Sequence, residues 1–365
     1  MLPNPLPSRY LVGMTPFDLL AIPKTDPLSI YRYRDGIYAG DLLAAALVHL
    51  DLFTWLTDRD ASSEEICSHF QLHARPTDVM LTLFNALGYL QCVENRWSST
   101  LMAQEHLTAD SPWNLTPYYG SLKDRPVTLD LLRVLRTGKP ANWGSYKMEE
   151  DWHKAMEKPE FAKSFTAAMD CRGVYLGGAL ARQLAPDGFH RLLDVGGGSG
   201  VYACSLVAHH PHLKATVLDK SPVDQIAAQA ISARGFDDRV GVMACDMFAQ
   251  EWPEGYDLHL LSNVLHDWDD PEVAELLRRS FAALPAGGMI IIHDAFINAD
   301  KSGPLAVAAY SVILMHSTEG KCYSITEYER FLIQAGFEGI SFSQTVADRA
   351  VMTARKPSKK GGILA

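Results

Sequence analysis

The sequence predicts a doubly wound α/β domain preceded by a mostly helical domain. Residues 191 to 209 have the pattern of a short buried strand, a glycine-rich turn from Gly196 to Gly200, and a helix. A second apolar run ends in Asp219, nineteen residues after Gly200, where an acid can accept hydrogen bonds from a ribose. From residue 190 onward, apolar runs alternate regularly with helical patterns, as they do in parallel sheets covered by helices.

Composition restricts the classes of protein to which the chain can belong. Its 365 residues are enough for two or more packed units, and a net charge of −10 disfavours binding to a nucleic acid. Six cysteines without a C-x-x-C pair argue against a zinc site or a disulfide framework. No apolar run approaches the roughly 20 residues of a membrane span, and the start of the chain lacks the layout of a signal peptide. We therefore expect a cytoplasmic protein with no metal and no membrane partner.

The first third of the chain is predicted to be an arm followed by a small helical domain. Residues 1–35 are rich in proline and aromatic residues, and we interpret them as an arm that packs onto something, such as a partner subunit. Between residues 36 and 110, three helical patterns precede a hairpin pattern at 89–97, which is the order of a winged helix. Residues 41–110 hold three Lys/Arg and ten Asp/Glu, a local net charge of −7 that disfavours DNA binding. Dimerisation or domain packing is the favoured role.

The segment before the glycine turn contains candidates for substrate contact. A helix over residues 162–172 would place Phe165 and Met169 on one face, at positions i and i+4. These two side chains could line a substrate pocket or pack a core. Arg172, one turn beyond Met169, could anchor an anionic substrate or form an ordinary surface salt bridge.

Five predicted strand ends carry polar residues, and ligands of such sheets bind at the carboxyl ends of the strands. The five are the glycine turn, Asp219, Asp246, the turn from His266 to Trp268, and Asp294. Asp246 could accept a hydrogen bond from an adenine amino group, with Met247 and Phe248 packed on the ring. The arrangement predicts a single site along one edge of the sheet.

His266 is the candidate general base, because the free pKa of histidine lies near neutrality. Asp294 could hold and polarise its imidazole, as carboxylates do in other base–orienter pairs. An isolated histidine is more often structural, but the position of His266 among the five strand ends favours catalysis.

Residues 40–356 resemble the small-molecule O-methyltransferases of the caffeate and acetylserotonin type, which use S-adenosyl-L-methionine. The resemblance is carried by Leu193-Asp-Val-Gly-Gly-Gly-Ser-Gly200, Asp246-Met-Phe248, Val264-Leu-His-Asp-Trp268, Pro285-Ala-Gly-Gly288, Tyr310-Ser311, Thr318-Glu-Gly320 and Ala335-Gly-Phe337.

The resemblance implies a division of the chain and a role for each part. It implies a winged-helix domain that forms a homodimer (36–110), a helical region that caps the substrate (111–188) and a Rossmann-like methyltransferase domain (189–357). The residues themselves indicate the arm (1–35) and, from two lysines and two glycines near the end, a disordered tail (358–365). His266 would deprotonate the acceptor hydroxyl with the help of two acids, the first of them Asp294, and Phe165 and Met169 would enclose the acceptor and the methyl donor. S-adenosyl-L-homocysteine would be the second product. The implied cofactor-binding residues are Asp194, Gly196, Gly198, Gly200, Asp219, Asp246, Met247, Phe248, Ser262 and Trp268.

Three positions depart from the family pattern. Asp294 is shorter than the usual glutamate, Cys322 occupies the position of the second acid, and Ser262 replaces a lysine often found four residues before the histidine. Two explanations remain open: the acceptor hydroxyl is acidic enough to need less help, or the nucleophile needs no deprotonation. In the second case the acceptor would be a thioether acid such as methylthiohydroxybutyrate. Its carboxylate would bind Arg172 or Lys321, and its sulfur would contact Tyr119 or Tyr146.

We expect a homodimeric methyltransferase acting on a small-molecule acceptor, with O-methylation favoured over S-methylation. Three other classes compete: an NAD-dependent oxidoreductase, a winged-helix regulator that uses a Rossmann-like domain to sense a ligand, and a fold that binds the cofactor without methylating. The G-x-G-x-G spacing of the turn and the acidic first domain argue against the first two.

Overall fold

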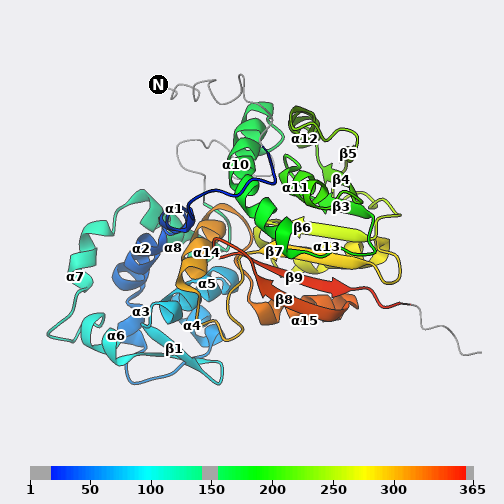
Figure 1. Ribbon diagram of the computed structural model, residues 1–365. Helices are drawn as coiled ribbons and strands as arrows, with labels where there is room; N and C mark the ends of the chain where they lie inside the picture. The colour runs from blue at the N-terminus through cyan, green and yellow to red at the C-terminus, as the bar shows by residue number, and fades with distance from the viewer. Residues whose placement is uncertain (1–17, 142–154, 359–365) are drawn as a thin grey trace, which may run out of the picture.

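The computed structural model describes residues 18–141 and 155–358. In the C-terminal half, a seven-stranded sheet has the order β5-β4-β3-β6-β7-β9-β8 (Figure 1). Five neighbouring strands run parallel, and the last two are antiparallel to their neighbours. The strands are β3 (Arg191–Val195), β4 (Lys214–Asp219), β5 (Val240–Ala244), β6 (Leu258–Ser262), β7 (Met289–Asp294), β8 (Glu338–Gln344) and β9 (Ala350–Arg355). This is the predicted doubly wound sheet.

Helices cover both faces of the sheet, which is why its central strands are apolar on both sides (Figure 1). Successive side chains of a strand point to opposite faces, so Leu192 packs in one core and Leu193 in the other. The first core is closed by α10 (Pro159–Gln183), α11 (Val201–His209) and α12 (Val223–Ala233). The second is closed by α13 (Asp270–Ala283) and α15 (Ile325–Ala335).

The N-terminal half is a helical unit with one hairpin, in the order that the sequence predicts. Ser62 and Glu65 form a reciprocal capping box that begins α4, and the hairpin turns at Glu94 and Asn95, both with positive φ. The elements are α1 (Leu28–Asp35), α2 (Ala39–Ala44), the π-helical turn η2 (Ala45–Leu50), α3 (Leu52–Trp55), α4 (Ser63–Phe70), α5 (Ala74–Ala86), β1 (Leu90–Val93), β2 (Arg96–Ser99), α6 (Leu101–His106), α7 (Thr116–Tyr119), η3 (Gly120–Leu122) and α8 (Pro126–Thr137).

The described part of the predicted arm packs against its own chain. The Tyr31 ring of α1 stacks on Tyr175 of α10, and Arg32 makes a two-pronged ion pair with Asp348 in the turn between β8 and β9. Residues 1–17 lie outside the described ranges. The contacts of α1 are therefore made within the protomer.

One helix from the C-terminal half completes the core of the N-terminal unit. Helix α14 (Leu305–Ser317) is apolar on every side, which is the pattern of a helix buried all round. Its Val312 and Met315 pack in the same core as Leu83 and Phe84 of α5, and Figure 1 shows α14 among the N-terminal helices. The two halves are thus tied together by a shared core. Within the described ranges, no helix combines the length and the apolar character needed to cross a bilayer.

Truncation of the shared helix should destabilise the fold. Met315 is fully buried, so Met315→Ala is expected to lower the free energy of unfolding by about 2–5 kcal/mol through lost burial and a residual cavity. Ile333 of α15 is 64% exposed, and Ile333→Ala should change the same quantity by about 0.5 kcal/mol or less. Urea unfolding followed by circular dichroism measures both; equal losses would contradict a core that depends on α14.

Candidate active site

The strand order brings the five predicted polar strand ends to one edge of the sheet. Because β5, β4, β3, β6 and β7 are parallel neighbours, their carboxyl ends lie side by side (Figure 1). The glycine turn follows β3, Asp219 ends β4, Asp246 follows β5, the His266 turn follows β6, and Asp294 ends β7.

The glycine turn has the backbone conformation that the sequence predicts. Gly196, Gly198 and Gly200 have φ values of 65°, 58° and 74°, a region that other residues rarely adopt. A β-carbon at Gly200 would lie 3.0 Å from Val217 and Ile231, so this glycine is required for packing. At Gly198 a β-carbon would meet no atom within 4 Å, so this face of the turn is open.

Two carboxylates stand beside this turn. Asp219 accepts hydrogen bonds from the backbone N–H groups of Gly198 (2.9 Å) and Lys220 (2.8 Å), and burial raises its pKa to about 6. Asp194 is 1% exposed, its Oδ2 has no hydrogen-bond partner, and burial raises its pKa to about 7. An open glycine cradle flanked by acceptor groups suits a nucleoside ligand with hydroxyl and amino groups.

The end of β5 contributes an acid and an aromatic pair. Asp246 is exposed, and its Oδ1 accepts from the N–H groups of Phe248 (2.8 Å) and Ala249 (3.1 Å), which fixes the turn. The Phe248 and Trp268 rings meet edge to face with centroids 4.5 Å apart. Both rings and Met247 are partly buried against the core below. These side chains form a part-apolar border to the site.

His266 and Asp294 form a buried hydrogen-bonded pair. His266 Nδ1 lies 2.5 Å from Asp294 Oδ1, and the two residues are 3% and 0% exposed. Burial opposes ionisation of Asp294, but the charge of His266 and hydrogen bonds from His266 and the Ala295 N–H hold the pKa of the carboxyl below its usual range. An ionised carboxylate only accepts, so Nδ1 carries a hydrogen, and in the neutral imidazole the lone pair lies on Nε2.

The surroundings of His266 hold one further acid. Asp267 Oδ1 lies 3.6 Å from His266 Nε2, and burial raises the pKa of Asp267 to about 6 although the charges of His266 and Arg172 act in the opposite direction. Cys322, at the position of the family's second acid, is 4% exposed, and its backbone N–H donates to Ser311 Oγ (2.9 Å).

Tyr310, Asn263 and Tyr202 had no role in the sequence-based prediction, yet they contact predicted residues at this edge. The Tyr310 ring meets the His266 ring edge to face at 5.9 Å, and the Tyr310 hydroxyl accepts from Arg172 Nη1 at 3.1 Å. Asn263, the residue after β6, accepts from Arg172 Nη2 at 3.1 Å and donates to the Tyr202 hydroxyl at 3.1 Å. The only local signal was that Asn263 directly follows a buried strand. Ser262 Oγ lies 3.2 Å from His293 Nδ1 and 3.1 Å from Asn263 Nδ2.

The backbone of the histidine turn is held by a distant segment. Gly320 packs so closely on this turn that a β-carbon would collide with the His266 carbonyl oxygen. Buried Arg75 of α5 donates to the Gly320 carbonyl (2.7 Å) and to the Gly138 carbonyl (2.5 Å). The Tyr323 hydroxyl donates to the Trp268 carbonyl at 2.7 Å.

The residues predicted to contact the acceptor do not all lie near His266. Phe165 and Met169 lie on α10; Phe165 is stacked on Phe161, and Met169 is 37% exposed. Tyr119 lies on α7, at the edge of the molecule far from the sheet (Figure 1), and packs against the N-terminal core. The structure therefore does not bring Tyr119 to His266 within one protomer. Tyr146 lies outside the described residues.

Lys321 is not a free anchor for a carboxylate, because it already forms two ion pairs. It is 5% exposed, and its Nζ lies 2.6 Å from both Asp78 Oδ2 and Glu327 Oε1. The expectation that it could hold a carboxylate is wrong, since the local acids neutralise its charge.

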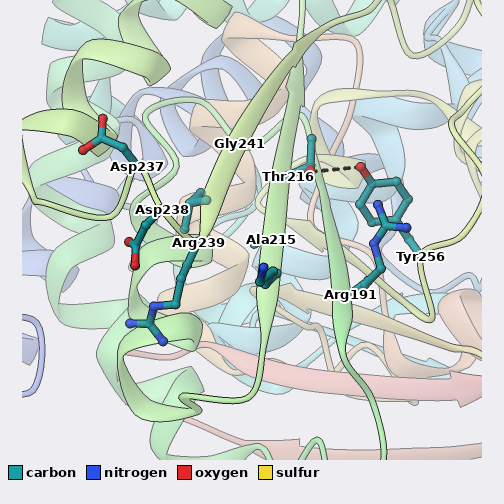
Figure 2. Close-up of a pocket in the computed structure, with 10 residues that line it drawn as sticks. Arg191, Ala215, Thr216, Asp237, Asp238, Arg239, Gly241 and Tyr256 are labelled. Carbon is teal, nitrogen blue, oxygen red and sulfur yellow. Dashed lines mark hydrogen bonds between the residues drawn. The ribbon is translucent and has the colours of Figure 1, made fainter.

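A hollow at the opposite edge of the sheet is separate from this site. Arg191 and Arg239, at or beside the amino ends of their strands, line it with Tyr256 (Figure 2). Lys214 also lines the hollow, whose volume is about 280 Å³. No cluster of three or more His, Cys, Asp or Glu side chains suited to a metal ion occurs in residues 18–141 and 155–358.

The buried carboxylate of Asp194, whose Oδ2 has no hydrogen-bond partner, should make stability depend on pH. A pKa raised to about 7 from an unfolded value near 4 means that Asp194 favours folding below pH ~4, and that this contribution is lost as pH rises through 7. The free energy of unfolding of the wild type, relative to Asp194→Asn, should therefore fall between pH 4 and pH 7. Urea unfolding without cofactor measures it, and a difference that does not change with pH would refute the expectation.

Comparisons with known proteins identify the family of the chain. The O-methyltransferase domain family matches residues 131–338. The 3-hydroxy-5-methyl-1-naphthoate 3-O-methyltransferase of Streptomyces sahachiroi is 31% identical over 85% of this chain and 89% of that protein. The acetylserotonin O-methyltransferase of Bos taurus is 36% identical over 89% and 96%. The crystal structure of an O-methyltransferase family 2 protein of Planctomyces limnophilus in complex with apigenin superposes with a TM-score of 0.85 at 30% identity, covering 94% of this chain and 100% of that chain. The chain therefore belongs to the S-adenosylmethionine-dependent O-methyltransferases, and it is a methyltransferase with the Rossmann-like class I fold.

Proposed function

We propose that the enzyme methylates a hydroxyl oxygen of a small-molecule acceptor, with His266 as the general base. The observation that carries this proposal is the buried bond between His266 Nδ1 and Asp294 Oδ1. The bond selects the tautomer whose Nε2 is unprotonated, and an imidazole of this kind can take the proton from a hydroxyl within hydrogen-bond reach. Asp294 then stabilises the imidazolium that forms.

The residues at the strand ends suit S-adenosylmethionine. When bound, this cofactor supplies a methyl group on a positively charged sulfur. Asp219 would accept from the ribose hydroxyls, and Asp246 from the adenine amino group, with Met247, Phe248 and Trp268 against the ring. Asp194, the glycines of the turn and Ser262 would complete the contacts. The support for this assignment is the open face at Gly198 and the unpartnered Oδ2 of Asp194.

Transfer to an acceptor is an in-line displacement, so alignment at near-contact distance provides much of the rate enhancement. We assign the enclosing surface to Phe165 and Met169 of α10. This assignment is supported by the exposure of Met169, which is apolar and yet 37% exposed. Tyr119 is not included because α7 lies away from the sheet.

The proposal is tested by methyl transfer from labelled S-adenosylmethionine to phenols, hydroxyindoles, thioether acids and amines. For phenols, His266→Ala should reduce kcat by roughly 10²- to 10⁴-fold, and the loss should be smaller for more acidic phenols, which need less help from a base. Asp294→Asn should also reduce kcat, because an amide does not select the productive tautomer. His190→Ala, an exposed histidine at the other edge of the sheet, serves as the control.

One outcome would replace this proposal with S-methylation. A thioether needs no deprotonation, and Cys322 stands where a second acid would assist the base. If thioether acids alone were methylated, and His266→Ala kept much of the rate, His266 would only position the substrate.

We also infer a homodimer formed through the N-terminal half. Twelve of the sixteen exposed large hydrophobic side chains in the described ranges fall between residues 20 and 129, among them Leu101, Trp113 and Tyr118, which are 70%, 63% and 80% exposed. Surface of this kind is typical of a protein interface. We propose a second copy of this chain as the partner of this surface. DNA is disfavoured because the helical unit carries a negative local charge.

The six free cysteines support a cytoplasmic location.

Sedimentation of the purified full chain should give the mass of a dimer. Charges introduced at the exposed side chains, as in Leu101→Glu with Tyr118→Glu, should shift it toward the monomer, because an interface core does not accommodate unpaired charges. Ile333→Glu, an exposed change in α15, should leave the mass unchanged. A monomeric wild type would contradict the inference.

A further inference from the structure

Arg172 is a cation at the active edge that forms no ion pair with an acid of the described residues, although Asp35 and Asp267 act on it electrostatically at longer range. Its guanidinium bonds two uncharged oxygens, the Tyr310 hydroxyl and Asn263 Oδ1, both at 3.1 Å. Among residues 18–141 and 155–358, no carboxylate oxygen lies within 4.0 Å of its nitrogens, whereas Arg349 pairs with Asp35 and Arg234 with Asp170. The two bonds use two of the five N–H groups of a guanidinium. A partly buried arginine that has no ion-pair partner is well suited to bind an anion.

The location of Arg172 connects this charge to the proposed base. Tyr310, which Arg172 contacts, lies edge to face with His266, and Asn263 is three residues before His266 in the chain. The guanidinium is thus one side chain away from the imidazole. An acceptor whose hydroxyl reaches Nε2 could place a second polar group at Arg172.

Helix α10 holds Arg172 in this place through two contacts made by neighbouring residues of the same helix. Gly173 lies directly against Val201 at the start of α11, so closely that a β-carbon would collide with it. One turn earlier on the same face, Asp170 makes an ion pair of 2.6 Å with Arg234, the residue that follows α12. The packing of α10 against α11 and the ion pair of Asp170 therefore fix the part of the helix that carries Arg172.

The same helix face offers an apolar surface next to the charge. Phe165, Met169 and Arg172 are at positions i, i+4 and i+7 and so share one face of α10, over a length of roughly 10 Å at 1.5 Å per residue. That length and polarity match an aromatic ring system with an anionic substituent. Resting on the function proposed above, we propose that the acceptor is a hydroxy-substituted aromatic carboxylate whose carboxylate binds Arg172.

The cofactor also has a carboxylate at its amino-acid end. The test must therefore show whether Arg172 binds the carboxylate of the acceptor or that of the cofactor. The contacts favour the acceptor, because Arg172 bonds Tyr310 beside His266 and extends a face with the apolar side chains of α10, whereas the open side of the cradle is at Gly198. The remaining alternative is that Arg172 binds no carboxylate and only holds Asn263 and Tyr310 in place.

The experiment compares 3-hydroxy-2-naphthoic acid and 3-hydroxybenzoic acid with their methyl esters, in the wild type, Arg172→Gln and Arg172→Lys. In the wild type kcat/KM should be higher for the acids. Arg172→Gln should lower kcat/KM for the acids by roughly 10- to 100-fold, mainly through KM, and leave the esters within about threefold. Arg172→Lys should fall between. Arg182→Gln, at the exposed end of the same helix, should change neither.

Calorimetric binding of the same acids and of S-adenosylhomocysteine completes the test. Retained binding of S-adenosylhomocysteine by Arg172→Gln, with loss of the preference for acids, supports the proposal. Weakened binding of S-adenosylhomocysteine with an unchanged preference would assign Arg172 to the cofactor, and equal losses for acids and esters would assign it to structure; either result overturns the proposal. If no hydroxyl is methylated but the acids still bind selectively through Arg172, the function proposed above fails while the anion site stands.

Discussion

The parallel alignment of five neighbouring strands is the constraint on which the site depends. It brings residues that are far apart in the chain, such as Asp219 and Asp294, to one edge of the sheet. Because β6 and β7 are adjacent, with Ser262 opposite His293, the histidine that follows one strand meets the carboxylate that ends the other. The pair is buried, so the orientation of the His266 ring is fixed by its bond to Asp294 and not by solvent.

The shared core gives this edge a second support. Helix α14 belongs to the chain segment after β7, yet it packs with α5 of the N-terminal unit. Tyr310 of α14 lies between His266 and the guanidinium of Arg172, and the guanidinium of Arg349 lies 4.5 Å from the centroid of its ring. A residue of the N-terminal core thus forms part of the wall around the proposed base.

The sequence predicted those features that depend on local pattern. The strand, glycine turn and helix around Gly196, the strand ends at Asp219 and Asp294, and the hairpin at Glu94 all follow from periodicity and turn chemistry. Contacts across long separations did not follow from it. The residues around Lys321 in the sequence do not predict its ion pair with Asp78, which is 243 residues away. The aromatic character of Tyr119 does not indicate where α7 lies. Such contacts depend on how the packed elements come together in three dimensions.

The bonds of Arg75 bear on how the two halves can move. One guanidinium on α5 fixes the carbonyl groups of Gly138 and Gly320, and Gly320 rests on the backbone of the histidine turn. A hinge motion about the segment after β7 that separates the two halves would break the buried, charge-assisted hydrogen bonds of Arg75. It would also separate α14 from its core. These bonds hold the N-terminal unit against the His266 turn, so we expect a substrate to enter by displacement of elements other than α5 and α14.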